Sequence, residues 1–274
     1  MRATTRRDRL FFGAGGITIV MVLLSRSVLG HFEVLVADKP ARRAGEPVRL
    51  TYYRGHPFEC EILDTEPPER VAVLKPDGKT WVDLKPSPKK VDNFDGGQAT
   101  VQTLRYTPTE RGDHLVALTT KMRFDAHEAV FTQQHLRLTL HVQAQWGWDH
   151  VAGLPLELVP LTRPYGLEPG FVVKAQARLG GKPVADAVVE IEKYHARPPK
   201  NMPSDDALIT RAVKTDVNGY VVATLDEPGW WMLCVTVNDG TKLRDGKPYP
   251  VRRQGFLWLY VDPKTDTVAG GAEG

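Results

Sequence analysis

The chain has 274 residues, of which 42% are hydrophobic and 25% charged, a composition that excludes a disordered or fibrous protein. Its net charge of +3 originates in residues 1–30, where five arginines and one acid give +4 and leave −1 for residues 31–274. Since the remainder has no excess of Lys and Arg to neutralise phosphates, we expect no nucleic-acid partner.

Residues 1–30 have the parts of an export signal: an arginine-rich start, an apolar stretch, and small residues up to Gly30. Cleavage after Gly30 would make His31 the first residue. The pair Arg6 and Arg7 resembles a twin-arginine signal, although an ordinary secretory signal with extra arginines explains it equally well. We expect an exported protein, in the periplasm or on the surface of a bacterium, that contacts the membrane only through this segment if it is not cleaved.

Short runs of β-branched and aromatic residues, separated by Gly, Pro, Asn and Asp clusters, follow the signal and are typical of β-sandwiches. In the run 135–143, strict alternation predicts a polar, solvent-facing side with His135 and Arg137 and an opposite side of leucines. The first set of predicted strands covers 31–37, 47–53, 70–76, 99–108, 114–120 and 135–143.

A second set of strand runs lies within 171–196, 210–239 and 255–263, after a stretch rich in Pro and Gly. The sequence therefore predicts an all-β protein with two sandwich domains of immunoglobulin-like or carboxypeptidase-regulatory-like type after an N-terminal signal segment. The predicted divisions are an export signal at 1–30, an N-terminal sandwich at 31–145, a linker at 146–168, a C-terminal sandwich at 169–263 and a disordered tail at 264–274.

Two features predict how the interior is built. Arg163 should pair with an acid, either Asp149 or Glu157, and so clamp the two domains together. Trp230 and Trp231 are consecutive in a strand, so one should face the core and the other should lie on the outer side.

Several motifs resemble a known family. The most specific are GHPFE at 55–59 and GLPLELVPLTRPYGL at 153–167, and QQHLRLTLHV at 133–142 adds to them. They resemble the periplasmic substrate-specific components associated with bacterial nickel and cobalt uptake, a family largely described as a domain of unknown function. The resemblance implies export, an all-β fold, and a role in metal acquisition with a membrane metal transporter as partner. This chain departs from members that end in a membrane helix, because 240–274 contain no apolar span.

The histidines that match the family's motif positions are His31, His56 and His135, which the resemblance implies as ligands of nickel. Copper, cobalt and zinc also accept imidazole nitrogen. A free α-amine on His31 would add a donor, and His127 and Glu59 are weaker candidates for a remaining position. Each histidine also has an ordinary explanation: a fraying first residue at His31, a turn residue bonded to the backbone at His56, and a solvent-facing strand residue at His135.

The sequence thus favours an exported accessory protein that binds a divalent transition metal for uptake or delivery, without an organic cofactor. One alternative is a two-domain periplasmic or cell-surface interaction module that binds no metal. A remote alternative is a copper oxygenase of the histidine-brace type, in which an N-terminal histidine chelates copper through its amine and its ring. No nucleophile with a base partner, phosphate loop or catalytic carboxylate pair is recognisable, so we expect neither an enzyme nor a small organic substrate.

Overall fold

The structure, a computed structural model, describes residues 31–264, so the predicted export signal and all but the first residue of the predicted tail lie outside the described residues. The described part contains one short 3-10 helix, η1 (Asp206–Leu208), and no α-helix. Its strands are β1 (Phe32–Ala37), β2 (Ala41–Arg42), β3 (Val48–Gly55), β4 (Arg70–Leu74), β5 (Trp81–Asp83), β6 (Ser87–Asp92), β7 (Gln98–Tyr106), β8 (Gly112–Thr119), β9 (Arg123–Asp125), β10 (Val130–Val142), β11 (Leu156–Pro160), β12 (Val172–Leu179), β13 (Lys182–Pro183), β14 (Val188–Lys193), β15 (Arg211–Lys214), β16 (Tyr220–Thr224), β17 (Gly229–Arg244) and β18 (Lys247–Val261).

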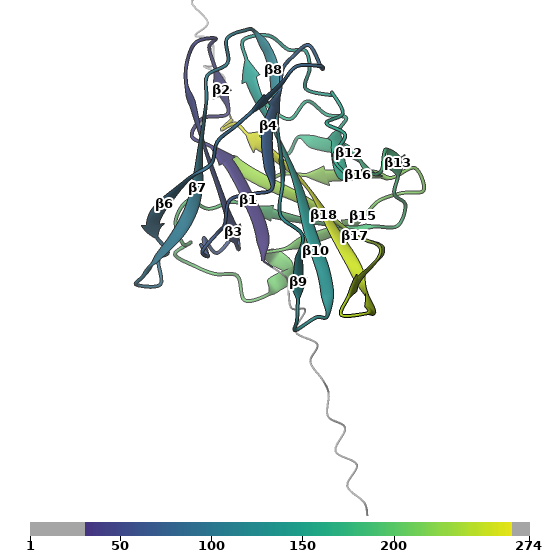
Figure 1. Cartoon of the computed structure of the whole chain (residues 1–274). Helices are drawn as coiled ribbons and strands as arrows, with labels where there is room; N and C mark the ends of the chain where they lie inside the picture. Colours follow the sequence, from purple (N-terminus) through teal and green to yellow (C-terminus); the bar gives the residue numbers. More distant parts are fainter. Residues whose placement is uncertain (1–30, 265–274) are drawn as a thin grey trace, which may run out of the picture. The chain divides into compact units, whose positions relative to one another are not determined.

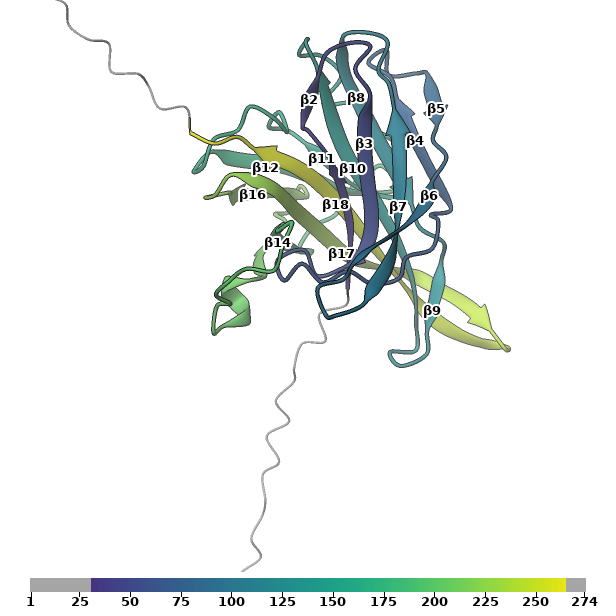
Figure 2. The same ribbon diagram turned by 90° about the vertical axis from the view of Figure 1, so that its left-hand side faces the viewer.

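These strands form three sheets (Figures 1 and 2). One four-stranded sheet has the order β1-β3-β7-β6, and another contains β11, β12, β13 and β16. The third sheet runs β15-β14-β17-β18-β10-β8-β4-β5, with β2 and β9 also paired to β10. The long strand β10 holds this sheet together, because its first part pairs in parallel with β18 and its last part pairs in antiparallel with β8.

Two large hydrophobic cores form in the described part of the chain, and a third, smaller cluster contains Leu74, Leu115 and Ala117. The first fills the space around β1 and β3 with side chains such as Leu50 and Leu138, and the second packs β11 and β12 against β14, β17 and β18. Strands β17 and β18 contribute alternate side chains to both cores, so Trp230 lies in the first core and Trp231 in the second. Both indoles are buried, whereas the sequence predicted one on the outer side; β17 is covered on both faces.

The structure confirms the predicted class, an all-β sandwich fold. The predicted boundary at 146–168 is crossed by the shared sheet, since β10 from the first half pairs with β18 from the second, and residues 31–264 belong to one compact unit. The two large cores therefore share a sheet and are not separated by a free linker.

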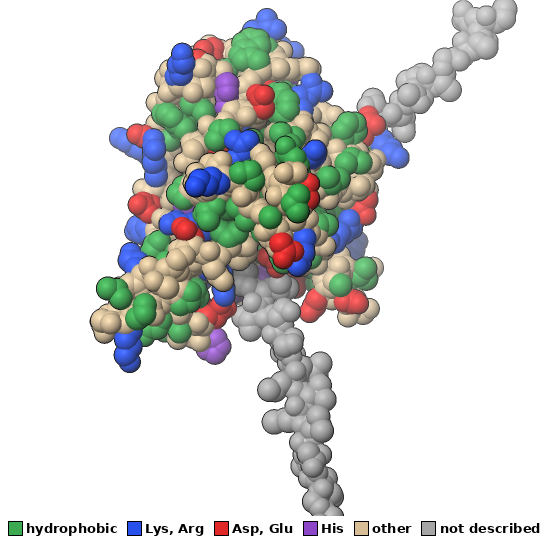
Figure 3. Space-filling model, turned by 90° about the vertical axis from the view of Figure 1, so that its right-hand side faces the viewer, with side chains coloured by type: hydrophobic (Ala, Val, Ile, Leu, Met, Phe, Trp, Pro, Cys, Tyr) green, Lys and Arg blue, Asp and Glu red, His purple; other side chains and the backbone are tan. Residues whose placement is uncertain are grey.

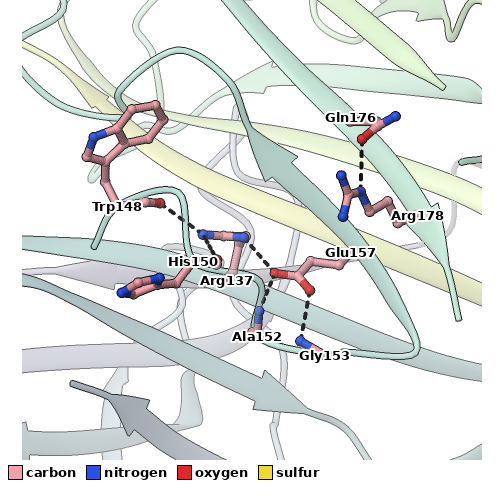
Figure 4. A network of polar contacts seen from close by, with 8 residues as sticks. All are labelled: Arg137, Trp148, His150, Ala152, Gly153, Glu157, Gln176 and Arg178. Carbon is pink, nitrogen blue, oxygen red and sulfur yellow. Dashed lines mark hydrogen bonds and ion pairs between the residues drawn. The ribbon is translucent and has the colours of Figure 1, made fainter. Parts of the chain in front are cut away.

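The polar face predicted for β10 is buried. Leu136 and Leu138 enter the first core, while Arg137 points to the opposite side and is fully buried beside Glu157 (Figure 4). Arg137 Nη1 donates to Glu157 Oε1 at 2.6 Å, and Nη2 donates to the carbonyl oxygens of Trp148 and His150 at 3.2 and 3.1 Å. Both faces of β10 are covered because the segment after it folds back onto the strand.

Arg163 forms no ion pair with Asp149 or Glu157, the two acids predicted as partners, and Glu157 is paired with Arg137. Arg163 instead donates to the side chain of Gln145, and its guanidinium lies 5.3 Å from the ring centre of Tyr165. The segment predicted as a linker is attached to the sheet through the buried ion pair of Glu157 with Arg137 of β10, and not through Arg163.

Candidate metal centre

His31 and His56 meet because β1 and β3 pair in antiparallel register. Phe32 lies opposite Gly55, so the same register extended by one residue places His31 opposite His56. Residues opposite each other in an antiparallel pair share a face, with Cβ atoms about 4.5–5.5 Å apart. The two imidazole ring centres are 5.2 Å apart.

Glu61 reaches the same place through a tight turn after β3. The amide of Glu61 donates to the carbonyl oxygen of His56 at 3.1 Å, and Cys60 just before it has a φ of 61°. This left-handed residue reverses the chain, and Glu61 Oε2 comes to lie 3.7 Å from Nε2 of His31 and 3.7 Å from Nε2 of His56. One carboxylate oxygen thus faces both imidazole nitrogens.

The cluster combines a buried carboxylate oxygen with two imidazole rings. Glu61 Oε2 is buried and has no hydrogen-bond partner among the described residues. Burial is the main cause that lowers the pKa of His31; Glu61 opposes it, while His56 and Arg54 add to it. A neutral imidazole offers a nitrogen lone pair, and a buried carboxylate oxygen needs a proton or a cation.

The three side chains fit a metal ion. Their donor atoms all lie within 4.8 Å of one another, and no other such group of His, Cys, Asp and Glu occurs between residues 31 and 264. Metal bonds of about 2.0–2.2 Å place neighbouring ligand atoms about 3.0–3.4 Å apart. The two 3.7 Å separations to Glu61 Oε2 exceed this by a few tenths of an ångström, and the two imidazole donors lie within 4.8 Å of each other. Three protein ligands also leave coordination positions open for an exchangeable group.

His135, the third ligand that the sequence predicted, does not join this cluster. It lies on the face of β10 opposite Leu136, whose side chain is in the core around β1. His135 is fully buried there, with Nδ1 3.2 Å from Thr119 Oγ1 and Nε2 3.4 Å from Arg253 Nη1. Burial, and secondarily the charge of Arg253, lower its pKa to about 4, so it is a neutral interior histidine.

The burial of His135 predicts a specific pH dependence of stability. Below pH 6.5 the unfolded chain protonates this imidazole, whereas the folded protein resists until about pH 4. Stability should therefore be lost as the pH falls from 6.5 to 4, by about 2–3 kcal/mol more in the wild type than in His135→Asn. Urea denaturation of both proteins at several pH values measures this difference, and parallel pH curves would contradict the assignment.

The two weaker sequence candidates also lie outside the cluster. His127 is exposed in a turn, where its amide donates to Asp125 Oδ1, and Glu59 is exposed in the loop that carries His56. Sequence reasoning missed Glu61, although it stands only five residues after His56 in the run HPFECE. The run contains one acid on each side of Cys60, and their spacing from His56 does not distinguish Glu61 from Glu59.

On the face drawn in Figure 3, Lys and Arg side chains are interspersed with Asp and Glu, and that face carries no basic stripe. Within residues 31–264, no helix has the length and hydrophobicity needed to cross a bilayer. Charge on this face is therefore mixed, as the near-neutral composition predicts.

The fold and the site define an all-β sandwich protein with a His-His-Glu cluster where its first two long strands meet. Residues 28–239 match the family described as Domain of unknown function (DUF4198), and the chain belongs to that family. No curated protein matches the chain.

The solved structures that match this chain share little sequence with it. The D0-D1 domain of intimin is 14% identical over 84% of this chain and 100% of that domain, with a TM-score of 0.21. Alpha-2-macroglobulin from Escherichia coli is 14% identical over 84% of this chain and 16% of that protein, with a TM-score of 0.25. A DUF4785 family protein from Legionella pneumophila is 12% identical over 75% of this chain and 52% of that protein, with a TM-score of 0.29. These similarities carry no conclusion about function.

Proposed function

We propose that this protein is an exported accessory protein that binds a divalent transition metal at His31, His56 and Glu61 and serves its uptake or delivery. The observation that supports this most strongly is the buried Oε2 of Glu61, which faces two imidazole nitrogens and has no hydrogen-bond partner in the described part of the chain. The resemblance to nickel and cobalt uptake components suggests nickel, and the donor set also suits copper, cobalt and zinc. The role is binding and not catalysis, with a membrane metal transporter as the partner.

The exposure of the ligands favours capture and release over a closed structural site. The side chain of His31 is 43% exposed, whereas those of His56 and Glu61 are 19% and 30% exposed. A half-exposed ligand lets an ion enter and leave, and a partner protein can approach it from that side. If the export signal is removed after Gly30, the α-amine of His31 adds a fourth donor.

Removal of one imidazole should abolish tight binding. Calorimetric titration of the protein beginning at His31 with Ni²⁺, Cu²⁺ and Zn²⁺ should give submicromolar affinity for at least one ion, and His56→Ala should weaken it by about 100-fold or more. Glu61→Gln keeps the shape of the side chain but loses its charge, and it should weaken binding by about 10–100-fold.

The matched control is His127→Ala, which removes an exposed histidine outside the cluster and should leave the affinity unchanged. One extra residue placed before His31 blocks the α-amine and keeps the ring, so a loss of affinity identifies the amine as a ligand. If no heat of binding is measured for any of the three ions, the metal site is rejected. The interaction module that binds no metal is then favoured.

A further inference from the structure

The loop that carries the metal ligands is held in place by the end of β14, a strand that pairs with β17 and contributes to the second core. We propose that His195 is a positioning residue for the metal centre: it touches no metal ligand atom but fixes the loop between His56 and Glu61. This inference rests on the proposed metal-binding function and goes beyond it, because it names what sets the affinity.

Three contacts tie His195 to the loop. Its amide donates to the carbonyl oxygen of Pro57 at 2.9 Å, and its ring Nδ1 lies 2.7 Å from the carbonyl oxygen of Phe58. The ring also packs edge-on against the ring of Phe58, with centres 4.6 Å apart and planes at 70°. A carbonyl oxygen only accepts, so Nδ1 carries the proton and donates.

His195 is itself held by the sheet. In the strand before it, Lys193 pairs with Trp231 of β17, and the amide of Tyr194 donates to the carbonyl oxygen of Trp230 at 2.9 Å. The rings of Tyr194 and Trp258 also meet edge-on. The position of His195 is therefore fixed by the largest sheet, and its hydrogen bonds transfer that position to Pro57 and Phe58.

Pro57 and Phe58 follow directly after His56, and Phe58 precedes Glu61 by three residues. The placement of these two residues therefore sets the distance between the imidazole of His56 and the carboxylate of Glu61. Besides the contacts of His195, the turn around the left-handed Cys60 is closed by the bond of the Glu61 amide to His56 and by the antiparallel bridge of Leu63 with Arg54. A ligand loop that is already in the bound geometry loses less conformational entropy when the ion binds. Loss of the His195 contacts should therefore weaken binding without removal of any ligand.

The test compares His195→Ala, His195→Phe and His195→Asn by calorimetric titration with Ni²⁺ and with Cu²⁺. His195→Ala should weaken binding about tenfold, and His195→Phe, which keeps the ring contact but lacks the Nδ1 donor, about threefold or more. His195→Asn places an amide N–H near the position of Nδ1 and should restore the affinity to within about threefold of the wild type. If the imidazole of His195 contributes only packing against Phe58, His195→Asn should not restore the metal affinity.

The matched control is His150→Ala, because Nε2 of His150 also bonds a backbone carbonyl oxygen, that of Pro76 at 2.9 Å, at a place outside the cluster. It should cost stability and leave the affinity within twofold of the wild type. If the wild type binds neither ion, the proposed function fails. If the wild type binds and both His195→Phe and His195→Ala bind equally well, only the positioning role is overturned.

A second measurement needs no metal and remains valid if His195→Ala does not fold. The amide of Glu61 is bonded to the carbonyl oxygen of His56, so its hydrogen exchange reports whether the loop keeps its turn. In metal-free protein, exchange at Glu61 should be about tenfold faster in His195→Phe than in the wild type, and unchanged in His150→Ala. Equal exchange in His195→Phe and the wild type would overturn the positioning role.

Discussion

Glu157→Ala should lower the free energy of unfolding by about 3–5 kcal/mol, among the largest effects of any single change in this protein. The substitution leaves the guanidinium of Arg137, whose side chain is 0% exposed, without its counter-charge in the interior. It also removes the acceptor of two backbone amides, those of Ala152 and Gly153 at 2.9 and 3.1 Å (Figure 4). Urea denaturation at pH 7, followed by tryptophan fluorescence, measures the loss.

An exposed ion pair of good geometry is the matched control. Arg211 donates through both terminal nitrogens to Asp226 at 2.9 and 3.0 Å, but the two side chains are 39% and 53% exposed. Asp226→Ala should therefore cost less than about 1 kcal/mol. If Glu157→Ala changes the free energy of unfolding by less than about 1 kcal/mol, the buried pair is contradicted. The double variant Arg137→Met/Glu157→Leu should recover much of the stability lost in Glu157→Ala, because it leaves no unpaired charge in the interior.

The class of fold could be predicted from the sequence because strand runs and turn residues are local signals. The single shared sheet could not, because the parallel pairing of β10 with β18 joins residues such as Phe131 and Val251 that are far apart in the chain. The two wrong predictions of outward-facing side chains have a different cause. Alternation predicts which side chains share a face, but both faces of β10 and of β17 are covered, so Arg137 and both tryptophans, Trp230 and Trp231, are buried.

Two of the three residues of the candidate site could be predicted. His31 and His56 stand at the ends of two strands that pair in a simple register, and the sequence places both at a strand end. Glu61 could not be found in this way, because its position depends on the left-handed Cys60, a conformation that non-glycine residues rarely adopt. The sequence drew attention to Glu59, which is nearer to His56 in the chain but is exposed.

Gly55→Ala should disturb both the fold and the site. A Cβ at Gly55 would lie 1.9 Å from the carbonyl oxygen of Glu61 and 2.8 Å from its carbonyl carbon. The obstacle is backbone, so no side-chain rotation relieves the contact and the turn must move. We expect a loss of about 1–3 kcal/mol in the free energy of unfolding, and a metal affinity at least about tenfold weaker because Glu61 moves with its backbone.

Gly97→Ala is the control for this substitution, because the added Cβ would meet only the side chain of Asn93, at 3.5 Å. It should change stability by less than about 0.5 kcal/mol and leave metal affinity intact. Wild-type stability and affinity in Gly55→Ala would mean that the turn does not approach β3 as closely as the structure shows. Lost affinity in a folded Gly55→Ala protein would show instead that the close approach at this glycine brings the carboxylate to the two histidines.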